Sequence, residues 1–333
     1  MARGLRAYQR RRVGGKSSRP VRGNQLSLAK EGKSADDSIS KAGKRTLSRR
    51  ELSKHQRFEQ ISPEVGELDE FALDQALVEA PDDTLAMLAD LTGATDPKLR
   101  ELARRLAGRL MLDIARRGSH RGRGVGRMTL RPYQPDSGDI DIDASLDAIN
   151  ELRRHGATQV DQLKVRDWMR PSTALCLVVD RSGSMGGRPL AISALATAAV
   201  AHRCPSDYSV IVFGSDVVVV KSQDTSKSSD HVVNTVLRMR GFGTTNLSEA
   251  LVAAHQQLQR SRASRKITVL LSDCRASVIG DIIGAARNLD ELVILAPLGD
   301  DDEACNFATL VGARVTTVNG PSDIPDAFAR MFD

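Results

Sequence analysis

Aromatic residues and long apolar runs are scarce in this 333-residue sequence. Only 3% of its residues are Phe, Trp or Tyr, although 41% are hydrophobic, so a core must be built from Leu, Val, Ile and Ala. No apolar run approaches the roughly 20 residues that a membrane-spanning helix needs. The basic start is not followed by the apolar segment of a secretory signal, which favours a solvated basic tail and, second, an organelle transit peptide.

Cysteine and histidine are also sparse and carry no metal-binding spacing. None of the 4 cysteines lies in a C-x-x-C pair, and the 6 histidines form no H-E-x-x-H motif. This argues against a disulfide framework or a zinc site and fits reduced thiols in a cytoplasmic protein. The G-K-S fragments at residues 15–17 and 32–34 lack the earlier glycine of a P-loop. We therefore expect a cytoplasmic protein that does not hydrolyse ATP by itself.

Charge and composition divide the chain into four parts. Residues 1–60 hold 17 of the 48 Lys and Arg but only 5 of the 42 Asp and Glu, so the remainder is net acidic. Residues 1–58 have few apolar positions and no periodicity, which predicts a disordered basic arm. Residues 59–116 are expected to be helical, with a solvated basic face favoured over a nucleic-acid-binding helix. A Gly/Arg-rich linker, an acidic strip and a short helix are expected over 117–172, and an α/β domain over 173–333.

Two segments ahead of that domain carry explicit helical signals. Asp96 and Pro97 form an N-cap followed by a first-turn proline. An apolar stripe at helical spacing then comprises Leu99, Leu102, Leu106, Leu110 and Ile114. A short helix is also predicted over Ser145–His155.

The last part of the chain alternates apolar runs with helical stretches. Strands are predicted at Ala174–Val179, Tyr208–Phe213, Val217–Lys221, Ile267–Leu271, Leu292–Ala296 and Arg314–Val318. Helices are predicted at Pro189–His202, His231–Leu237, Leu247–Arg260, Ile279–Asn288, Asp302–Leu310 and Ile324–Met331. The second and third strands are joined by a short turn and form a hairpin, whereas helices separate the others. This order predicts a doubly wound, mostly parallel six-stranded sheet with helices on both faces. Such sheets bind ligands beyond the carboxyl ends of their strands, where the strand order reverses.

A D-x-S-x-S motif follows the first of these strands. Asp180, Ser182 and Ser184 alternate there, and the intervening glycine permits a tight loop on which three oxygen-bearing side chains converge. Hard oxygen ligands suit Mg²⁺, Mn²⁺ or Ca²⁺ rather than zinc. The same pattern occurs at residues 36–40 and 224–228, where no buried strand precedes it. Strand context, and not the motif alone, therefore selects Asp180–Ser184.

Two later segments supply further candidate ligands. Thr245 lies in the loop that opens a helix, and Asp273 ends a second buried strand. Taken singly, Thr245 fits a helix cap and Asp273 fits an N-cap of the following turn at least as well. Together with the D-x-S-x-S segment, they favour a divalent metal site for which Mg²⁺ is the preferred ion.

These residues resemble the metal-ion-dependent adhesion site of von Willebrand factor A (VWA) domains. VVDRSGSMGGRPL is similar to the family's first strand and metal loop, GTTNLSEAL to its threonine loop, and LLSD to its fourth-strand aspartate. The resemblance implies that Ser182, Ser184 and Thr245 bind the ion through hydroxyls. It implies that Asp180 and Asp273 orient them, partly through water, and that one position stays open for a partner's carboxylate.

The chain departs from the family's pattern at two positions. Thr244 stands where a second glycine is usual, so the threonine ligand is Thr245 or Thr244, with alignment favouring Thr245. Cys274 stands where a glycine often follows the last aspartate, which puts the geometry around Asp273 in question. The order of helical segment, R-G-R-G linker and acidic strip resembles bacterial VWA proteins encoded beside MoxR-type AAA+ ATPases. It is also similar to the C-terminal half of the magnesium chelatase D subunit, without that subunit's AAA+ module.

The resemblance implies an interaction module and not an enzyme. Its ion would accept an Asp or Glu from another protein, such as a MoxR-type AAA+ ATPase or that ATPase's client, in an adaptor or co-chaperone role. Nucleic-acid binding through the basic arm is the alternative. Metal-dependent hydrolysis is less favoured, because the motif segments offer no general base.

Overall fold

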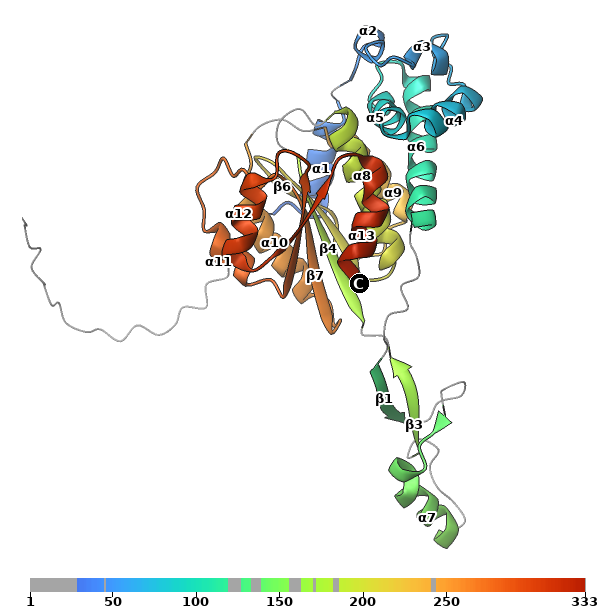
Figure 1. Ribbon diagram of the computed structural model, residues 1–333, viewed down its shortest axis with the longest axis vertical. Coiled ribbons are helices and arrows are strands. Elements are labelled where there is room, and N and C mark those ends of the chain that lie inside the picture. Colours follow the sequence, from blue (N-terminus) through green and yellow to red (C-terminus); the bar gives the residue numbers. More distant parts are fainter. Residues whose placement is uncertain are drawn as a thin grey trace, which may run out of the picture.

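The computed structural model describes residues 29–44, 46–118, 127–132, 139–155, 163–169, 172–181, 186–240 and 244–332. A six-stranded sheet occupies the centre of the larger body (Figure 1). Its strands are β4 (Thr173–Asp180), β5 (Tyr208–Phe213), β6 (Val217–Lys221), β7 (Arg265–Leu271), β8 (Glu291–Pro297) and β9 (Arg314–Val318). The spatial order is β6-β5-β4-β7-β8-β9, with only β5 and β6 antiparallel. The predicted doubly wound α/β fold and its hairpin are confirmed.

The central strands are almost entirely buried because helices cover both faces of the sheet. From β4, the face that carries Leu175, Leu177 and Val179 packs in the cluster with α8 (Gly187–Arg203), α9 (Ser229–Arg238) and α13 (Ile324–Phe332). The other face packs with α10 (Leu247–Gln259), α11 (Ile282–Arg287) and α12 (Asp302–Val311). This explains the continuous apolar runs, since a strand covered on both faces has no solvent-facing positions. The strand order reverses at β4, which places the end of β4 at the ligand-binding crevice of such folds.

Residues 29–44 and 46–58, predicted as part of a disordered arm, are ordered and contain helices. They form α1 (Lys33–Ala42), α2 (Arg49–Leu52) and the start of α3 (Phe58–Ile61). Lys30 pairs with the edge strand β6, its N–H donating to the carbonyl of Val217 at 2.8 Å. Both Nη atoms of Arg260 donate hydrogen bonds to the carboxylate of Glu31, at 2.5 and 2.8 Å. Few but well-placed apolar residues and these polar anchors order the segment, and residues 1–28 lie outside the described part.

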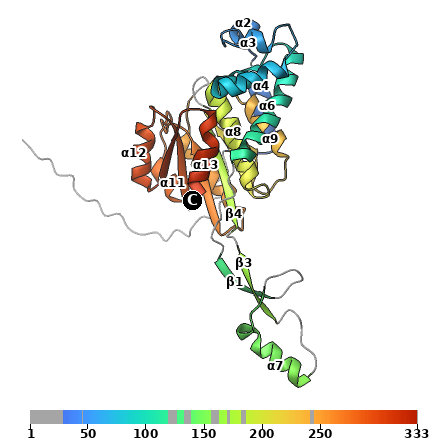
Figure 2. The same ribbon diagram turned by 45° about the vertical axis from the view of Figure 1, so that its right-hand side comes forward.

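The helical region over 59–116 continues with α4 (Glu70–Glu79), α5 (Pro81–Leu91) and α6 (Pro97–Gly118). The fully buried face of α6 is one position away from the predicted leucine stripe. Its residues are Leu99, Ala103, Ala107, Met111 and Ala115, whereas Leu102 is 37% exposed. Small alanines allow α6 to pack closely on the alanine-rich α8, and the larger leucines flank that contact. Figures 1 and 2 both show α6 beside α8 and α9, and α5 packs on α8, so this region shares the core of the α/β domain.

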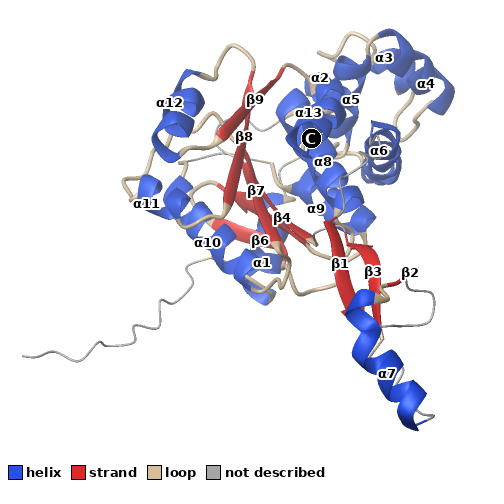
Figure 3. Cartoon of the chain, turned by 60° about the horizontal axis from the view of Figure 1, so that its bottom comes forward, coloured by secondary structure: helices blue, strands red, loops and turns tan. Residues whose placement is uncertain are grey.

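Residues 117–172 contain more than the predicted linker. β1 (Arg127–Pro132), β2 (Asp139–Ile140) and β3 (Lys164–Met169) form a small antiparallel sheet in the order β1-β3-β2. The predicted short helix is present as α7 (Leu146–His155), after a 3-10 turn at Asp143–Ser145 (Figure 3). β1 pairs with β3 from Arg127 opposite Met169 to Pro132 opposite Lys164, in a segment for which the Gly/Arg composition predicted a linker. Among the described helices, none is both long and apolar enough to cross a membrane.

Candidate metal centre

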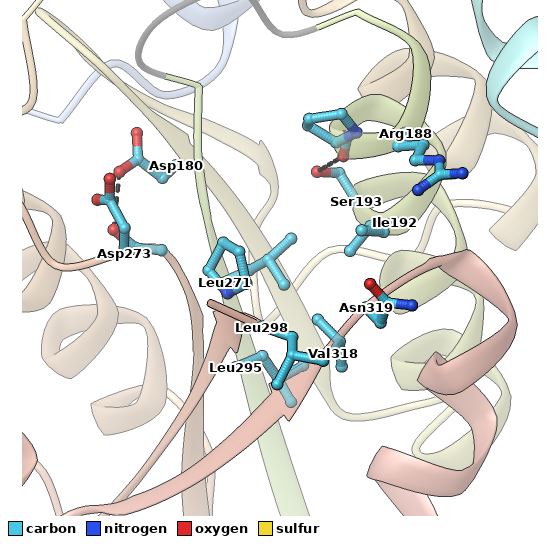
Figure 4. Close-up of a pocket in the computed structure, with 13 residues that line it drawn as sticks. Asp180, Arg188, Ile192, Ser193, Leu271, Asp273, Leu295, Leu298, Val318 and Asn319 are labelled. Carbon is cyan, nitrogen blue, oxygen red and sulfur yellow. Dashed lines mark hydrogen bonds between the residues drawn. The ribbon is translucent and has the colours of Figure 1, made fainter. Parts of the chain in front are cut away.

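Asp180 and Asp273 lie together at the carboxyl edge of the sheet. β4 and β7 are parallel neighbours, with Val179 paired to Leu271, so Asp180 ends one strand beside the loop that carries Asp273. Both aspartates line the same cavity, and Figure 4 shows them at one end of it. Asp180 and Asp273 thus lie at the same edge of the sheet, as the sequence predicted, at the point where the strand order reverses.

Ser272 holds the Asp180 carboxylate in place. Its Oγ donates to Asp180 Oδ2 at 2.7 Å, and the same Oγ accepts the backbone N–H of Cys274 at 3.0 Å. Asp180 is 9% exposed and Ser272 5% exposed, so this hydrogen bond is shielded from water. The sequence analysis did not single out Ser272. The sequence did contain a clue to its role, because Ser272 is a hydroxyl residue placed between the last apolar residue of a buried strand and a candidate ligand.

Thr245 is buried, whereas Thr244 is exposed. The carbonyl of Thr245 accepts N–H groups from Ser277 at 3.1 Å and Val278 at 3.3 Å, which ties its loop to the loop after Asp273. Thr245 is only 2% exposed, and its hydroxyl makes no hydrogen bond to any other described residue. Burial thus favours Thr245 over Thr244 as a donor to a bound ion.

The N-cap of α10 is Asn246. Its side chain accepts the N–H of Glu249 at 3.3 Å, and its own N–H donates to the carbonyl of Gly214 after β5 at 2.9 Å. Thr245 therefore does not cap α10, because the next residue, Asn246, does so. The threonine loop is joined to the ends of both β5 and β7, and these flank β4.

Ser182 and Ser184 fall within residues 182–185, which lie outside the described part. Their loop starts at Arg181, whose N–H donates to the carbonyl of Phe213 at 2.8 Å. The loop ends at Gly186 and Gly187, where α8 begins. Both ends of the loop therefore lie at the same edge as Asp180.

Asp273 has a structural role as well as a possible ligand role. Its Oδ1 accepts the N–H of Arg275 at 3.0 Å, so one oxygen organises its own turn. Cys274 adopts a φ of 63°, the one positive value among described non-glycine residues. This left-handed conformation is the one that glycine adopts readily, and it explains why the missing glycine matters. Burial, then the nearby charges of Asp273 and Asp180, raise the pKa of Cys274 to about 12, so its thiol is no nucleophile.

The two other D-x-S-x-S matches lie in unrelated settings. Residues 36–40 lie inside helix α1, where their side chains point around a helix instead of converging. In the match at residues 224–228, Ser228 is the N-cap of α9 and accepts the N–H of His231 at 3.3 Å. The match at residues 224–228 does come shortly after a buried strand, β6, contrary to the expectation from the sequence. Because β6 is antiparallel to β5, it ends at the opposite edge of the sheet from Asp180.

A cavity of about 330 Å³ opens beside the two aspartates. Figure 4 shows Arg188, Ile192 and Ser193 of α8 on one wall, and apolar residues from the ends of β7, β8 and β9 on the other. Those apolar residues are Leu271, Leu295, Pro297, Leu298 and Val318. A side chain that approaches the aspartates from solvent would thus meet an apolar surface next to them.

The donor set present here fits a hard divalent cation. Among the described residues, no three His, Cys, Asp or Glu side chains converge, so a metal centre must use hydroxyl donors. The hydroxyl of the buried residue Thr245 and the fixed carboxylate of Asp180 are oxygen donors. Carboxylate and hydroxyl oxygens suit Mg²⁺ better than the nitrogen- and sulfur-loving zinc.

Comparison with known proteins gives a family match for part of the α/β domain. Residues 175–275 match the family model of the von Willebrand factor type A domain. Among curated proteins, none matches this chain.

Solved structures with a similar fold come from several kinds of protein. One is a von Willebrand factor type A protein from Catenulispora acidiphila, with 16% identity over 51% of this chain and a TM-score of 0.39. That match covers 43% of the other chain, so the two share less than half of its length. The vWF domain of the type V pili tip protein from Porphyromonas gingivalis has 12% identity, covers 49% of this chain and 95% of its own, and has a TM-score of 0.41. Manganese-loaded TRAP protein from Plasmodium vivax has 16% identity, with coverages of 49% and 72% and a TM-score of 0.37.

Proposed function

We propose that the von Willebrand factor type A domain of this chain is a metal-dependent protein-interaction module. A divalent ion is held by Asp180, Ser182, Ser184, Thr245 and Asp273. The observation that carries this proposal is the position of two strand-end aspartates on one cavity at the strand-order reversal, with the loop of the buried Thr245 tied to the loop after Asp273. The ion, when bound, supplies a positive charge with one position open to a carboxylate of another protein.

The chain's own residues prepare this site for binding. Ser272 fixes Asp180, so the carboxylate does not have to be ordered when the ion arrives. The backbone bonds of Thr245 to Ser277 and Val278 fix the threonine loop in the same way. Preorganisation of this kind strengthens binding because less entropy is lost. Mg²⁺ is the proposed ion, with Mn²⁺ and Ca²⁺ as alternatives.

The proposed partner is a MoxR-type AAA+ ATPase or a client of that ATPase, recognised through an exposed Asp or Glu. The chain itself has no P-loop, so an ATP-driven process needs a second protein. An adaptor or co-chaperone fits these requirements. The apolar wall beside Asp273 offers a surface for the residues that flank the partner's carboxylate.

The test is a binding measurement between this protein and the MoxR-type ATPase encoded nearest to its gene. We expect binding in Mg²⁺, loss of binding in EDTA, and loss in the variant Ser182→Ala. The matched control is Ser226→Ala, which alters the middle serine of an exposed D-x-S-x-S match and should bind as the wild type does. Equal binding in Mg²⁺ and EDTA, with Ser182→Ala unimpaired, would refute the metal-dependent module.

Two other functions are supported less well. Nucleic-acid binding through the basic arm predicts an affinity that falls steeply with salt and is lost when residues 1–28 are removed. In the described part of the arm, residues 29–44 and 46–58, Lys30 and Glu31 bind to the rest of the protein. Hydrolysis would need a general base. The carboxylate nearest to Thr245 in sequence is that of Glu249, and it is already engaged as the acceptor of a hydrogen bond from Asn246 Nδ2 at 2.7 Å.

A further inference from the structure

A single carboxylate in α5 joins segments that lie far apart in the sequence. Asp90 Oδ1 accepts the backbone N–H of Gly187 at 2.9 Å and Nη1 of Arg240 at 3.2 Å. Its other oxygen lies 3.0 Å from Nε2 of His55. The Asp90 side chain is only 13% exposed. This aspartate therefore links the helices before the VWA domain to two points inside that domain.

The first of those points is the start of α8, directly after the loop of Ser182 and Ser184. The N-cap position of α8 holds Gly186, which has no side chain to satisfy the free N–H groups of the first turn. Asp90 takes over that role from another helix, and its negative charge also suits the positive end of the helix dipole. The approach is close, since a Cβ on Gly186 would lie 3.3 Å from Asp90 Oδ1. Gly187 itself has a φ of 54° and tolerates no ordinary side chain without strain.

The second point is Arg240, which precedes the loop of Thr245. Its side chain is 6% exposed, and Nη2 also donates to the carbonyl of Asp90 at 2.8 Å and of Ala89 at 3.3 Å. The guanidinium lies so close to Gly93 that any Cβ at that position would collide with it. Arg240 is thus fixed on the end of α5 by several bonds, and this fixes where the Thr245 loop begins.

The Asp90 carboxylate is held in its charged form. Burial by itself raises the pKa of Asp90, but the hydrogen bonds from His55 and Gly187 and the charge of Arg240 outweigh it and lower the pKa overall. A charged acceptor makes hydrogen bonds about twice as strong as a neutral one. The contacts to both loops are therefore strong ones in a shielded setting.

We propose that Asp90 is a positioning residue that couples the upstream helices to the metal centre. It holds Gly187 and Arg240, which adjoin the two loops that carry the proposed ligands Ser182, Ser184 and Thr245. Because coupling between two sites is reciprocal, a bound ion stabilises the contact of α5 with the VWA domain in return. A partner that moves the upstream helices would thereby change metal affinity, and through it the affinity for a carboxylate. This inference rests on the proposed function.

The first test is titration of the full chain with Mn²⁺, with free Mn²⁺ read by electron paramagnetic resonance. Asp90→Asn keeps the size of the side chain and removes its charge, and it should weaken Mn²⁺ binding by about 10-fold to 100-fold, the range for residues that orient metal ligands. The matched control is Asp83→Asn. Asp83 also links α5 to α8, through Arg188 at 2.6 Å, but this pair is 70% and 50% exposed and joins two side chains, whereas Asp90 holds the backbone N–H of Gly187. The control should bind Mn²⁺ as the wild type does.

The second test uses the wild-type protein alone and so does not depend on how well the variant folds. Amide hydrogen exchange is measured with and without Mn²⁺. Coupling predicts slower exchange in α5 when Mn²⁺ is present, with no change in α12, which lies on the opposite face of the sheet. If the wild type binds no Mn²⁺, the proposed function and this inference both fail. If Mn²⁺ binds, but exchange in α5 is unchanged or Asp90→Asn binds as tightly as Asp83→Asn, the coupling is refuted and the metal centre stands.

Discussion

Replacement of Cys274 by glycine and by alanine should reverse the usual order of stability of these two residues. At an ordinary position glycine is less stable than alanine by about 0.5–1 kcal/mol, because it loses more freedom on folding. Cys274 has a φ of 63°, where a side chain costs about 1–2 kcal/mol in contact between Cβ and the backbone. Both variants remove the same sulfur, so their difference isolates the backbone. Cys274→Gly should therefore be more stable than Cys274→Ala by about 0.5–1 kcal/mol.

The measurement is urea unfolding followed by circular dichroism, with Cys204 as the control position. Cys204 is half-buried and ends helix α8, but its φ is −131°, which any residue adopts. There Cys204→Ala should be more stable than Cys204→Gly. If the alanine variant is also the more stable one at position 274, the backbone at this turn is not strained. The glycine that VWA domains often have at this position would then not be explained by backbone conformation.

Three further predictions concern the metal centre and the ordered part of the arm. Ser272→Ala removes the hydroxyl that donates to the β4 aspartate; stability in urea should fall by about 2 kcal/mol, and Mn²⁺ affinity by about tenfold. Thr245→Val should abolish Mn²⁺ binding in the same titration while Thr244→Val leaves it unchanged, and the opposite result would assign the ligand to the exposed threonine. The hydrogen bond from Arg260 is the largest influence on Glu31 and lowers its pKa from 4.5 to about 2. Its contribution is present above pH 4.5 and is lost as the pH falls towards 2, so Glu31→Gln should lose about 1 kcal/mol at pH 7 and almost nothing near pH 2. Equal losses at both pH values would show that charge plays no part in docking the arm.

The sheet was predictable because its strands are buried on both faces. Runs such as Leu175–Val179 contain no polar position, as expected of a strand that is covered on both faces. The position of Asp180 followed from that, since a polar residue directly after such a run must lie at the edge of the sheet. The predicted bounds of β5 and β6 agree with the structure because short turns fix where those strands begin and end.

Two of the wrong predictions, the disordered arm and the buried face of α6, failed because the outcome depends on distant partners. The segment of α1 has few apolar residues, and what orders it is the pairing of Lys30 with β6 and of Glu31 with Arg260. In α6, the leucine stripe was the most apolar one, but the neighbour is the alanine-rich α8. An alanine face fits that neighbour more closely than a leucine face does, so the shape of the partner decided which side was buried.

The link between Asp90 and α8 shows what kind of information the sequence holds about such contacts. The segment Met185-Gly186-Gly187 places no Ser, Thr, Asp or Asn at the start of a long helix, so the first N–H groups of α8 have no local acceptor. Buried backbone groups are almost always satisfied, and a helix without its own cap therefore requires an acceptor from elsewhere. The requirement can be read from the sequence, but the supplier cannot, because it lies 97 residues away. Where a helix without its own cap follows a ligand-binding loop, the residue that accepts the helix's first N–H groups also fixes the end of that loop. When a domain is joined to an upstream region, such acceptors are therefore the first residues to examine for coupling between the two.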